Sequence, residues 1–369
     1  MTRVVHLTSV HSRTDTRIFL KECRSLAIAG YDVSLIVADG KGEERKDGIL
    51  IYDVGRGHGR IDRMRNVTHR IYQKSLALDA DIYHFHDPEL IPIGVKLKSS
   101  GKKVVFDAHE DLPKQLLSKP YLNKSIGWLL SKIFSYYEQW TCQKLDAVVT
   151  ATPSINDKFI RINPLSININ NFPMLGELAQ ERADDQHLKN HVCYVGGITQ
   201  IRGIKEIVAA MELVNTSMRL QLVGQFSEPN TELELRAYEG WARVDALGFL
   251  DRVGVRDVLS RSVAGLVTFH PLPNHIDSQP NKMFEYMSAG IPVIASNFPL
   301  WREIIEGNDC GLCIDPLKPN EIAGAIDFLT INRERAREMG ENGKKAVVER
   351  YNWGVEEAKL LDLYYKLIK

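Results

Sequence analysis

The feature that most constrains the fold is a regular alternation along the whole chain. Short apolar runs are separated by segments whose apolar residues recur with a helical period. The first runs occupy residues 4–7, 33–37, 49–52, 82–85, 104–106 and 147–149. Strands of a parallel sheet are buried on both faces and appear as such runs, while the connecting helices cover the sheet. The pattern predicts an α/β fold with a doubly wound, open sheet.

The alternation restarts after a polar, charged stretch at residues 174–190, which we interpret as a linker. The later runs occupy residues 192–195, 220–223, 264–267 and 292–295. A single core seldom grows beyond about 250–300 residues. For a chain of 369 residues we therefore predict two Rossmann-like domains. They would span residues 1–173 and 174–350, and a helix at 351–369 would cross back to the first.

The charge balance bears on the partners. The chain has 47 Lys and Arg against 47 Asp and Glu, which argues against a nucleic-acid binder. Residues 1–173 carry 25 basic and 19 acidic side chains, whereas residues 174–369 carry 22 and 28. The excess of +6 in the first half indicates an anionic partner, such as a phosphate-bearing lipid or a membrane surface.

The cysteines and the apolar stretches bear on location. Five scattered cysteines fit a reducing compartment, and we interpret Cys310 and Cys313 as strand residues rather than a redox pair. No stretch approaches the roughly 18 apolar residues of a membrane span, and the N-terminus does not resemble a signal peptide. We expect a cytoplasmic protein, either free or in peripheral contact with the inner face of the cell membrane.

Polar clusters follow three predicted strands of the first domain, where ligands bind in open α/β sheets. They are residues 11–17, the group His84, His86, Asp87 and Glu89, and the group Asp107, His109, Glu110 and Asp111. We predict a functional cleft there. The same histidines and Asp107 could instead bind a metal, as in a metal-dependent hydrolase with a His-x-His pair. Hydrolases of that kind are usually built on one closed barrel, whereas this chain is predicted to form two open sheets. We therefore favour a cleft without a metal.

In the second domain, Gly196 and Gly197 lie between a predicted strand and a helix. Glycines let the backbone approach a phosphate, and a helix start presents free N–H groups. Arg202 and Lys205 add cations in the same segment. We predict a phosphate-binding loop; the alternative is that the glycines only form a turn.

Two carboxylates bracket a second helix start. Asp277 precedes a helix predicted over residues 281–289, Asn281 and Lys282 open it, and Glu285 lies one turn inside. The helix start and the lysine attract phosphate oxygens, and a carboxylate at Glu285 can accept hydrogen bonds from sugar hydroxyls. The alternative is a capping acid on a solvated helix.

These motifs resemble those of the retaining glycosyltransferases of family 4, which have the GT-B fold of two facing Rossmann-like domains. Asp277 and Glu285 look like the acidic E-x7-E pair of that family, and residues 290–296 look like the segment that follows it. Residues 196–203 resemble its phosphate loop. Residues 15–19, 86–89 and 107–110 resemble signatures of members that build bacterial polysaccharides.

The resemblance implies roles for single residues. Glu285 would hold the ribose, Asp277 would face the donor sugar, and His109 would lie near the reacting carbon. Arg202 would contact the diphosphate, assisted by Lys205 or Lys282. The other implied donor-binding residues are Gly196, Gly197 and Asn281. The implied residues on the acceptor and phosphate side are Asp15, Arg17, His86, Asp87 and Glu110.

The chain departs from the family pattern in three places. The first acid, Asp277, is shorter than the usual Glu. Gly197 stands where many members have a cation, and residues 297–300 replace a glycine-rich turn. We expect the last change to alter a wall of the donor pocket.

The expected reaction places negative charge on a departing diphosphate, which cations and helix N–H groups stabilise. The resemblance implies a reaction that needs neither a metal nor a cofactor beyond the nucleotide-sugar donor, and in agreement with it no Asp-x-Asp pair follows a predicted strand. No carboxylate stands out as a nucleophile, and we therefore favour attack on the same face of the sugar.

Two segments bear on the acceptor. Residues 56–70 hold five arginines and one acid. A solvated helix face explains them equally well, but the excess of +6 favours contact with a lipid diphosphate or anionic headgroups. A helix predicted over residues 125–142 carries Trp128, Phe134, Tyr137 and Trp140, which we interpret mainly as a stripe facing the core.

We therefore expect a hexosyltransferase-type enzyme that uses a nucleotide-diphosphate sugar, with a UDP-sugar favoured. We expect the acceptor to be a saccharide carried on a lipid, in the assembly of O-antigen, capsule or exopolysaccharide. The alternatives are an epimerase or phosphorylase of the same fold, and a sugar-nucleotide binder without activity.

Overall fold

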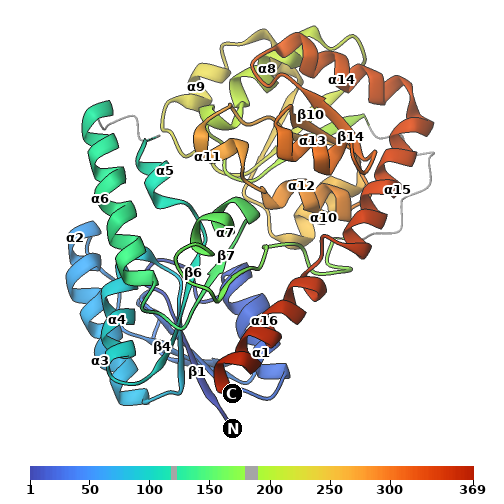
Figure 1. The fold of residues 1–369 in the computed structure, drawn as a ribbon. Coiled ribbons are helices and arrows are strands. Elements are labelled where there is room, and N and C mark those ends of the chain that lie inside the picture. The colour runs from blue at the N-terminus through green and yellow to red at the C-terminus, as the bar shows by residue number, and fades with distance from the viewer. Residues whose placement is uncertain (118–122, 179–189) are drawn as a thin grey trace. The chain divides into compact units, whose positions relative to one another are not determined.

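The computed structural model describes residues 1–117, 123–178 and 190–369. The chain forms two compact units, each with its own sheet of mainly parallel strands (Figure 1). Unit 1 comprises residues Met1–Asn171 and Trp353–Lys369, and unit 2 comprises Phe172–Asn352. The chain therefore leaves unit 1 once and returns to it once.

The sheet of unit 1 has eight strands among the described residues, in the order β3-β4-β2-β1-β5-β6-β7-β8. Its neighbouring strands are parallel except for β3 and β4, which are antiparallel. The strands are β1 (Arg3–Leu7), β2 (Asp32–Val37), β3 (Glu44–Lys46), β4 (Ile49–Asp53), β5 (Ile82–Phe85), β6 (Lys103–Ala108), β7 (Ala147–Thr150) and β8 (Ser166–Asn168).

The helices of unit 1 connect these strands, and the last of them comes from the end of the chain. They are η1 (Thr16–Cys23), α1 (Arg24–Ile28), α2 (Arg60–Asp62), η2 (Arg63–Val67), α3 (Thr68–Leu78), η3 (Pro88–Leu90), α4 (Ile91–Ser99), α5 (Leu112–Leu117), α6 (Lys124–Cys142), α7 (Pro153–Phe159) and α16 (Trp353–Ile368). The core between sheet and helices includes the stacked rings of Phe85 and Phe106.

Unit 2 has a fully parallel sheet of six strands in its described part, in the order β11-β10-β9-β12-β13-β14. These are β9 (His191–Val195), β10 (Arg219–Val223), β11 (Val244–Gly248), β12 (Ser262–Val267), β13 (Val293–Ser296) and β14 (Gly311–Ile314). The helices are η4 (Gln200–Arg202), α8 (Ile204–Leu213), α9 (Thr231–Leu235), η5 (Glu239–Arg243), α10 (Arg252–Ser260), α11 (Pro273–Ile276), α12 (Asn281–Ser288), α13 (Pro299–Ile305), α14 (Pro319–Ile331) and α15 (Arg333–Glu349).

The structure confirms the α/β class, since every predicted apolar run overlaps a strand. Most of the predicted linker, residues 179–189, lies outside the described residues. Among the described helices, none combines the length and apolar character needed to span a bilayer.

One expectation for α6 is wrong. Trp128 and Trp140 do not face the core but are 58% and 48% exposed. The buried positions of this helix are instead Gly127, Ser131, Glu138, Thr141 and Cys142.

Candidate functional site

Each sheet has one point at which the strand order reverses. It lies between β1 and β5 in unit 1 and between β9 and β12 in unit 2. Open α/β sheets bind ligands outside the carboxyl ends of their strands at such points. The predicted site residues gather at both reversals, so each unit is described separately.

In unit 2, the loop after β9 has backbone positions that suit only glycine. Gly203 has φ +79°, and a Cβ there would lie 2.1 Å from the backbone oxygen of Thr268. Gly196 has φ +120°, and its Cβ would lie 3.3 Å from Cε of Lys282. A side chain at either position would strain the backbone or press on a neighbour. The loop therefore runs close beside β12 and the start of α12.

Arg202 is held against this loop. Its Nη1 donates to the backbone oxygen of Gly197 at 3.1 Å, and the Tyr194 hydroxyl donates to the same oxygen at 2.8 Å. The guanidinium also lies 5.4 Å from the centroid of the Phe269 ring. Much of the guanidinium remains available, because five N–H donors share few protein acceptors.

Lys282 is the most unusual side chain of the cluster. It is buried in the first turn of α12, with Nζ 3.4 Å from the centroid of the Tyr194 ring. The amine has no hydrogen-bond partner among the described residues. Burial, followed by the charge of Arg202, holds the pKa of Lys282 well below its usual range. A buried amine without an acceptor is costly, so the cluster favours an anionic ligand.

The acidic pair lies nearby on the same unit. Glu285, in α12, accepts a hydrogen bond from Nη1 of Arg252 at 2.8 Å. Nε of Arg252 donates to Glu177 at 2.7 Å. Asp277 follows α11 directly and is partly buried. The sequence analysis missed Arg252, because nothing in its local pattern distinguishes it from other arginines at a helix start.

Two predicted donor-binding residues lie at the surface of the unit. Lys205 points to the surface, where Nζ pairs with Glu234 at 2.6 Å. Asn281 is exposed at the start of α12. In the described part of the chain, neither side chain forms a hydrogen bond with Gly196, Gly197 or Arg202.

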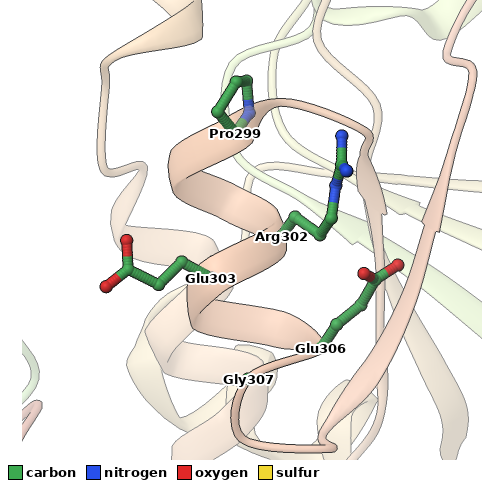
Figure 2. A pocket seen from close by; sticks show the side chains of 5 residues that line it. All are labelled: Pro299, Arg302, Glu303, Glu306 and Gly307. Carbon is green, nitrogen blue, oxygen red and sulfur yellow. The ribbon is translucent and has the colours of Figure 1, made fainter.

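Unit 2 also has two surface hollows. One, of about 440 Å³, lies at the carboxyl ends of β10 and β11 and is lined by Ile198, Leu222, Gly224, Gln225, Phe226, Glu232, Ala246 and Gly248. The other, of about 500 Å³, runs along α13. Figure 2 shows that Arg302 and Glu306 project from one side of this helix and Glu303 from the other. The first hollow has the position expected of a ligand site in this fold.

In unit 1, Asp107 at the end of β6 is the centre of a buried polar network. Arg17 donates to it twice, from Nε at 2.8 Å and Nη2 at 2.9 Å. His86 and His109 lie 3.2 and 2.9 Å from Oδ2 of the same carboxylate. Burial opposes ionisation, but Arg17 and then His109 hold the pKa of Asp107 well below its usual range. An ionised Asp107 therefore orients His109.

Three imidazole rings extend this network into the core. Nδ1 of His6 lies 2.9 Å from Nε2 of His86, and Nδ1 of His84 lies 2.9 Å from the Tyr364 hydroxyl of α16. Burial lowers the pKa of His86 to about 4 and holds those of His6 and His84 well below the usual value. At neutral pH all three rings are uncharged.

The same residues have the spacing of metal ligands. The ligand atoms of His6, Glu22, His84 and His86 lie within 4.8 Å of one another. However, Arg17 Nε lies 3.1 Å from Glu22 and 2.8 Å from Asp107. A fixed guanidinium would repel a second cation at this distance. Burial and Asp107 also raise the pKa of Glu22 despite Arg17, and a protonated carboxyl is a poor ligand. The charge of Arg17 and the raised pKa of Glu22 therefore weigh against a metal here, although the Glu22 oxygens and Nε2 of His84 have no hydrogen-bond partner among the described residues.

The loop after β1 brings two further acids together through His11. Asp87 accepts from the Thr8 hydroxyl at 2.8 Å and the Ser9 amide at 2.6 Å. Asp15 caps η1 by accepting from two backbone amides. His11 lies 3.4 Å from each carboxylate. Burial lowers the pKa of His11, but the hydrogen bond to Asp15 and the charge of Asp87 raise it above its usual value.

The structure thus gathers most of the predicted residues, but not all in the expected way. Arg17 is 3% exposed and serves as the buried partner of Asp107. Glu110 is exposed and bonds to Gln115. Residues that the sequence analysis missed include His6 and Tyr364. His6 aligns with His84 in the pairing of β1 and β5, and a histidine within an apolar run was the available signal.

The chain thus has two doubly wound units, one of which holds at its strand reversal a buried amine with no hydrogen-bond partner among the described residues, and such units define a class of two-domain α/β proteins. Two models of known protein families match parts of this chain. Residues 16–167 match the family model described as Glycosyltransferase Family 4, and residues 179–346 match that described as Glycosyl transferases group 1. Together the two models cover most of the chain, which therefore belongs to the family 4, group 1 glycosyltransferases.

The individual relatives match only part of this chain or share a low sequence identity with it. A GDP-mannose-dependent alpha-(1-6)-phosphatidylinositol monomannoside mannosyltransferase of Mycobacterium tuberculosis is 37% identical over 78 residues. That match covers 21% of this chain and only 20% of the relative. An MMP alpha-(1->4)-mannosyltransferase of Mycolicibacterium hassiacum is 25% identical over 175 residues, which cover 46% of this chain and 41% of the relative.

Two solved structures have a similar fold over almost the whole length of this chain. A sucrose-phosphate synthase from Thermosynechococcus elongatus superposes with a TM-score of 0.81 at 18% identity, and covers 100% of this chain and 99% of its own. HepE from Anabaena, in complex with UDP-glucose, gives a TM-score of 0.76 at 14% identity, with 99% and 100% covered. At these identities the likeness shows the fold, which is GT-B.

Proposed function

We propose that this chain transfers a hexose-type sugar from a nucleotide-diphosphate donor to a saccharide acceptor. The observation that carries the proposal is the buried Lys282 amine, which has no hydrogen-bond partner among the described residues and lies in one cluster with Arg202. Both cations border the glycine loop at the strand reversal of unit 2. A diphosphate supplies the acceptor oxygens that this cluster lacks.

The donor residues then have separate roles. Arg202, Lys282 and the N–H groups at the start of α12 stabilise the charge that develops on the leaving diphosphate. Glu285 accepts from the ribose hydroxyls once Arg252 yields one of its contacts, and Asp277 faces the sugar. In unit 1 we assign catalysis to His109, which Asp107 orients, and the acceptor and phosphate side to Asp15 and Asp87.

The donor base, the metal requirement and the stereochemistry form the second part of the proposal. The HepE structures contain UDP and UDP-glucose by their titles, which favours a UDP-sugar as donor. Arg202 and Lys282 supply the positive charge that a metal would otherwise bring, so we propose a metal-independent reaction. We also propose retention of configuration by same-face attack, since the cluster contains no carboxylate suited to act as a nucleophile.

For the acceptor we propose a lipid-linked saccharide in the assembly of a surface polysaccharide. The Mycobacterium tuberculosis relative is named for a phosphatidylinositol monomannoside acceptor, and residues 1–173 carry an excess of +6. Both favour peripheral contact of the protein with an anionic membrane surface at its cytoplasmic face.

The test measures UDP affinity by titration calorimetry. We expect Lys282→Met and Arg202→Ala each to weaken UDP binding by about 10- to 100-fold, because each removes a charge-assisted hydrogen bond to phosphate. Lys282→Met also removes a buried amine without an acceptor, so its free energy of unfolding should stay equal to that of the wild type or rise by about 1 kcal/mol.

Lys205→Met is the matched control, since Lys205 pairs with Glu234 on the surface of the same unit. It should bind UDP as the wild type does. Equal UDP affinity in the wild type and in Lys282→Met would refute the proposed donor site. Conversion of the donor without any acceptor would indicate an epimerase instead.

A further inference from the structure

Helix α6 presents a continuous apolar stripe to solvent. Its exposed large side chains recur at helical spacing along one face, and they are Ile126, Leu129, Leu130, Ile133, Tyr136 and Trp140. Trp128 is also exposed on α6, but its position in the helix lies outside the stripe. Contiguous exposed apolar surface of this kind marks an interaction site rather than ordinary solvent-facing surface.

The opposite face of α6 is already occupied and is made of small or polar residues. Gly127 and Ser131 are buried, as is Glu138, which forms an ion pair with Lys158 in the last turn of α7. Helix α5 packs on α6. A helix that packs into a core usually buries its large apolar side chains. Helix α6 buries small and polar residues instead and exposes the large apolar ones, which indicates that the stripe has a binding role.

The charges around the stripe indicate its occupant. Lys124 and Lys132 are exposed on α6, and its one acid, Glu138, is buried. Nζ of Lys132 lies 5.9 Å from the centroid of the Trp128 ring, and Nζ of Lys144 lies 3.1 Å from that of Trp140. Tryptophan, tyrosine and lysine around an apolar stripe are typical of helices that lie in the interface of an anionic bilayer.

We propose that the apolar stripe of α6 inserts among the headgroups of an anionic lipid surface and docks unit 1 there. The inference deepens the membrane contact of the proposed function by naming the element that makes it, and it takes from that function only the lipid-linked acceptor. It also moves the contact from the arginine-rich residues 56–70 to α6, with those arginines as added electrostatic attraction.

The experiment is flotation of the purified full chain with vesicles of phosphatidylglycerol and phosphatidylcholine, compared with vesicles of phosphatidylcholine alone. The variant is Leu129→Glu/Ile133→Glu. Its control is Ile28→Glu/Ile331→Glu, which changes two isoleucines that are 81% and 70% exposed elsewhere on the chain. UDP affinity is measured for every protein and reports that unit 2 is folded and binds its ligand.

We expect the wild type and the control to float with the anionic vesicles, and the α6 variant to partition at least about tenfold less, because two inserting side chains become charged. UDP affinity should be equal in all three. A wild type that does not float, or an α6 variant that floats equally, overturns the inference.

A second copy of the chain is the competing occupant. If the wild type forms a dimer that the α6 variant dissociates, and neither protein floats, the stripe is a dimer interface and the inference is wrong. Failure of the proposed function has a different signature, because a wild type that floats but does not bind UDP contradicts the donor site and leaves the docking surface standing.

Discussion

The buried histidines of unit 1 make its stability depend on pH. Burial lowers the pKa of His86 to about 4, from 6.5 in the unfolded chain. Between these pH values the unfolded chain binds more protons than the folded chain does. The free energy of unfolding therefore decreases as the pH falls from 6.5 to about 4. His86 alone contributes about 3 kcal/mol to this loss. Glu22 acts in the opposite direction, since its raised pKa favours folding most at low pH.

We therefore predict that His84→Gln flattens the fall in thermal stability between pH 7 and pH 4.5. The amide can keep the hydrogen bond to Tyr364 but cannot titrate, so one depressed pKa is removed from the balance. The control is His69→Gln, which changes an exposed histidine. Equal pH slopes for the wild type and His84→Gln, measured by calorimetric melting, would contradict a neutral buried ring at this position.

At this scale the sequence predicts residue types better than partners. The polar residues after β5 and β6 could be recognised because buried strands end where polar side chains begin. Arg17 appeared to belong to a phosphate-side loop, yet it is the buried partner of Asp107, which lies 90 residues further along the chain. Lys205 appeared to face a phosphate, yet it pairs with Glu234. Such pairings depend on tertiary contacts that no local pattern contains.

Among the elements, the loop between β9 and α8 provides the sharpest test. We predict that Gly203→Ala lowers both thermal stability and UDP affinity. Its Cβ would lie 2.1 Å from the Thr268 backbone oxygen, and φ of +79° is strained for alanine by about 1 kcal/mol or more. The displaced loop would move Arg202, so UDP affinity measured by calorimetry should fall with the melting temperature.

The matched control is Gly324→Ala in α14, where an added Cβ meets nothing within 4 Å. Alanine is the better helix former there, and stability should rise by about 0.5–1 kcal/mol with UDP affinity unchanged. If Gly203→Ala behaved like Gly324→Ala, the close approach of this loop to β12 would be wrong.

Helices and strands could be predicted where their burial produces a recognisable pattern of apolar residues in the sequence. The central strands are buried on both faces and were recognised as apolar runs. Strands β3, β8 and β11 were not recognised, because they are short or largely exposed and carry no such run. Helix α6 shows the other limit: its period identifies a stripe, but only the small residues Gly127 and Ser131 on the opposite face indicate which side packs inward.

At the scale of the whole molecule, unit 1 depends on a helix from the far end of the chain. The Tyr364 hydroxyl of α16 lies 2.9 Å from Nδ1 of His84 and 3.5 Å from Nε2 of His6. We predict that Tyr364→Phe destabilises unit 1 by about 1–3 kcal/mol, since it leaves a buried imidazole nitrogen without a partner. Hydrogen exchange at β1 and β5 should accelerate.

Tyr365→Phe is the control, because Tyr365 is 55% exposed on the same helix. Neither variant should change UDP affinity, since the proposed donor residues belong to unit 2. Unchanged exchange at β1 and β5 in Tyr364→Phe would show that the hydroxyl contributes nothing to this end of the sheet.

Unit 2 is an insertion between two pieces of unit 1, and this arrangement has a consequence for biosynthesis. Domains tend to fold as units while the ribosome is still translating. Residues 172–352 can complete their sheet as soon as they emerge, whereas the first unit to be made must wait for residues 353–369. The nascent chain should therefore complete unit 2 first, and the strands of unit 1 should remain accessible to chaperones the longest.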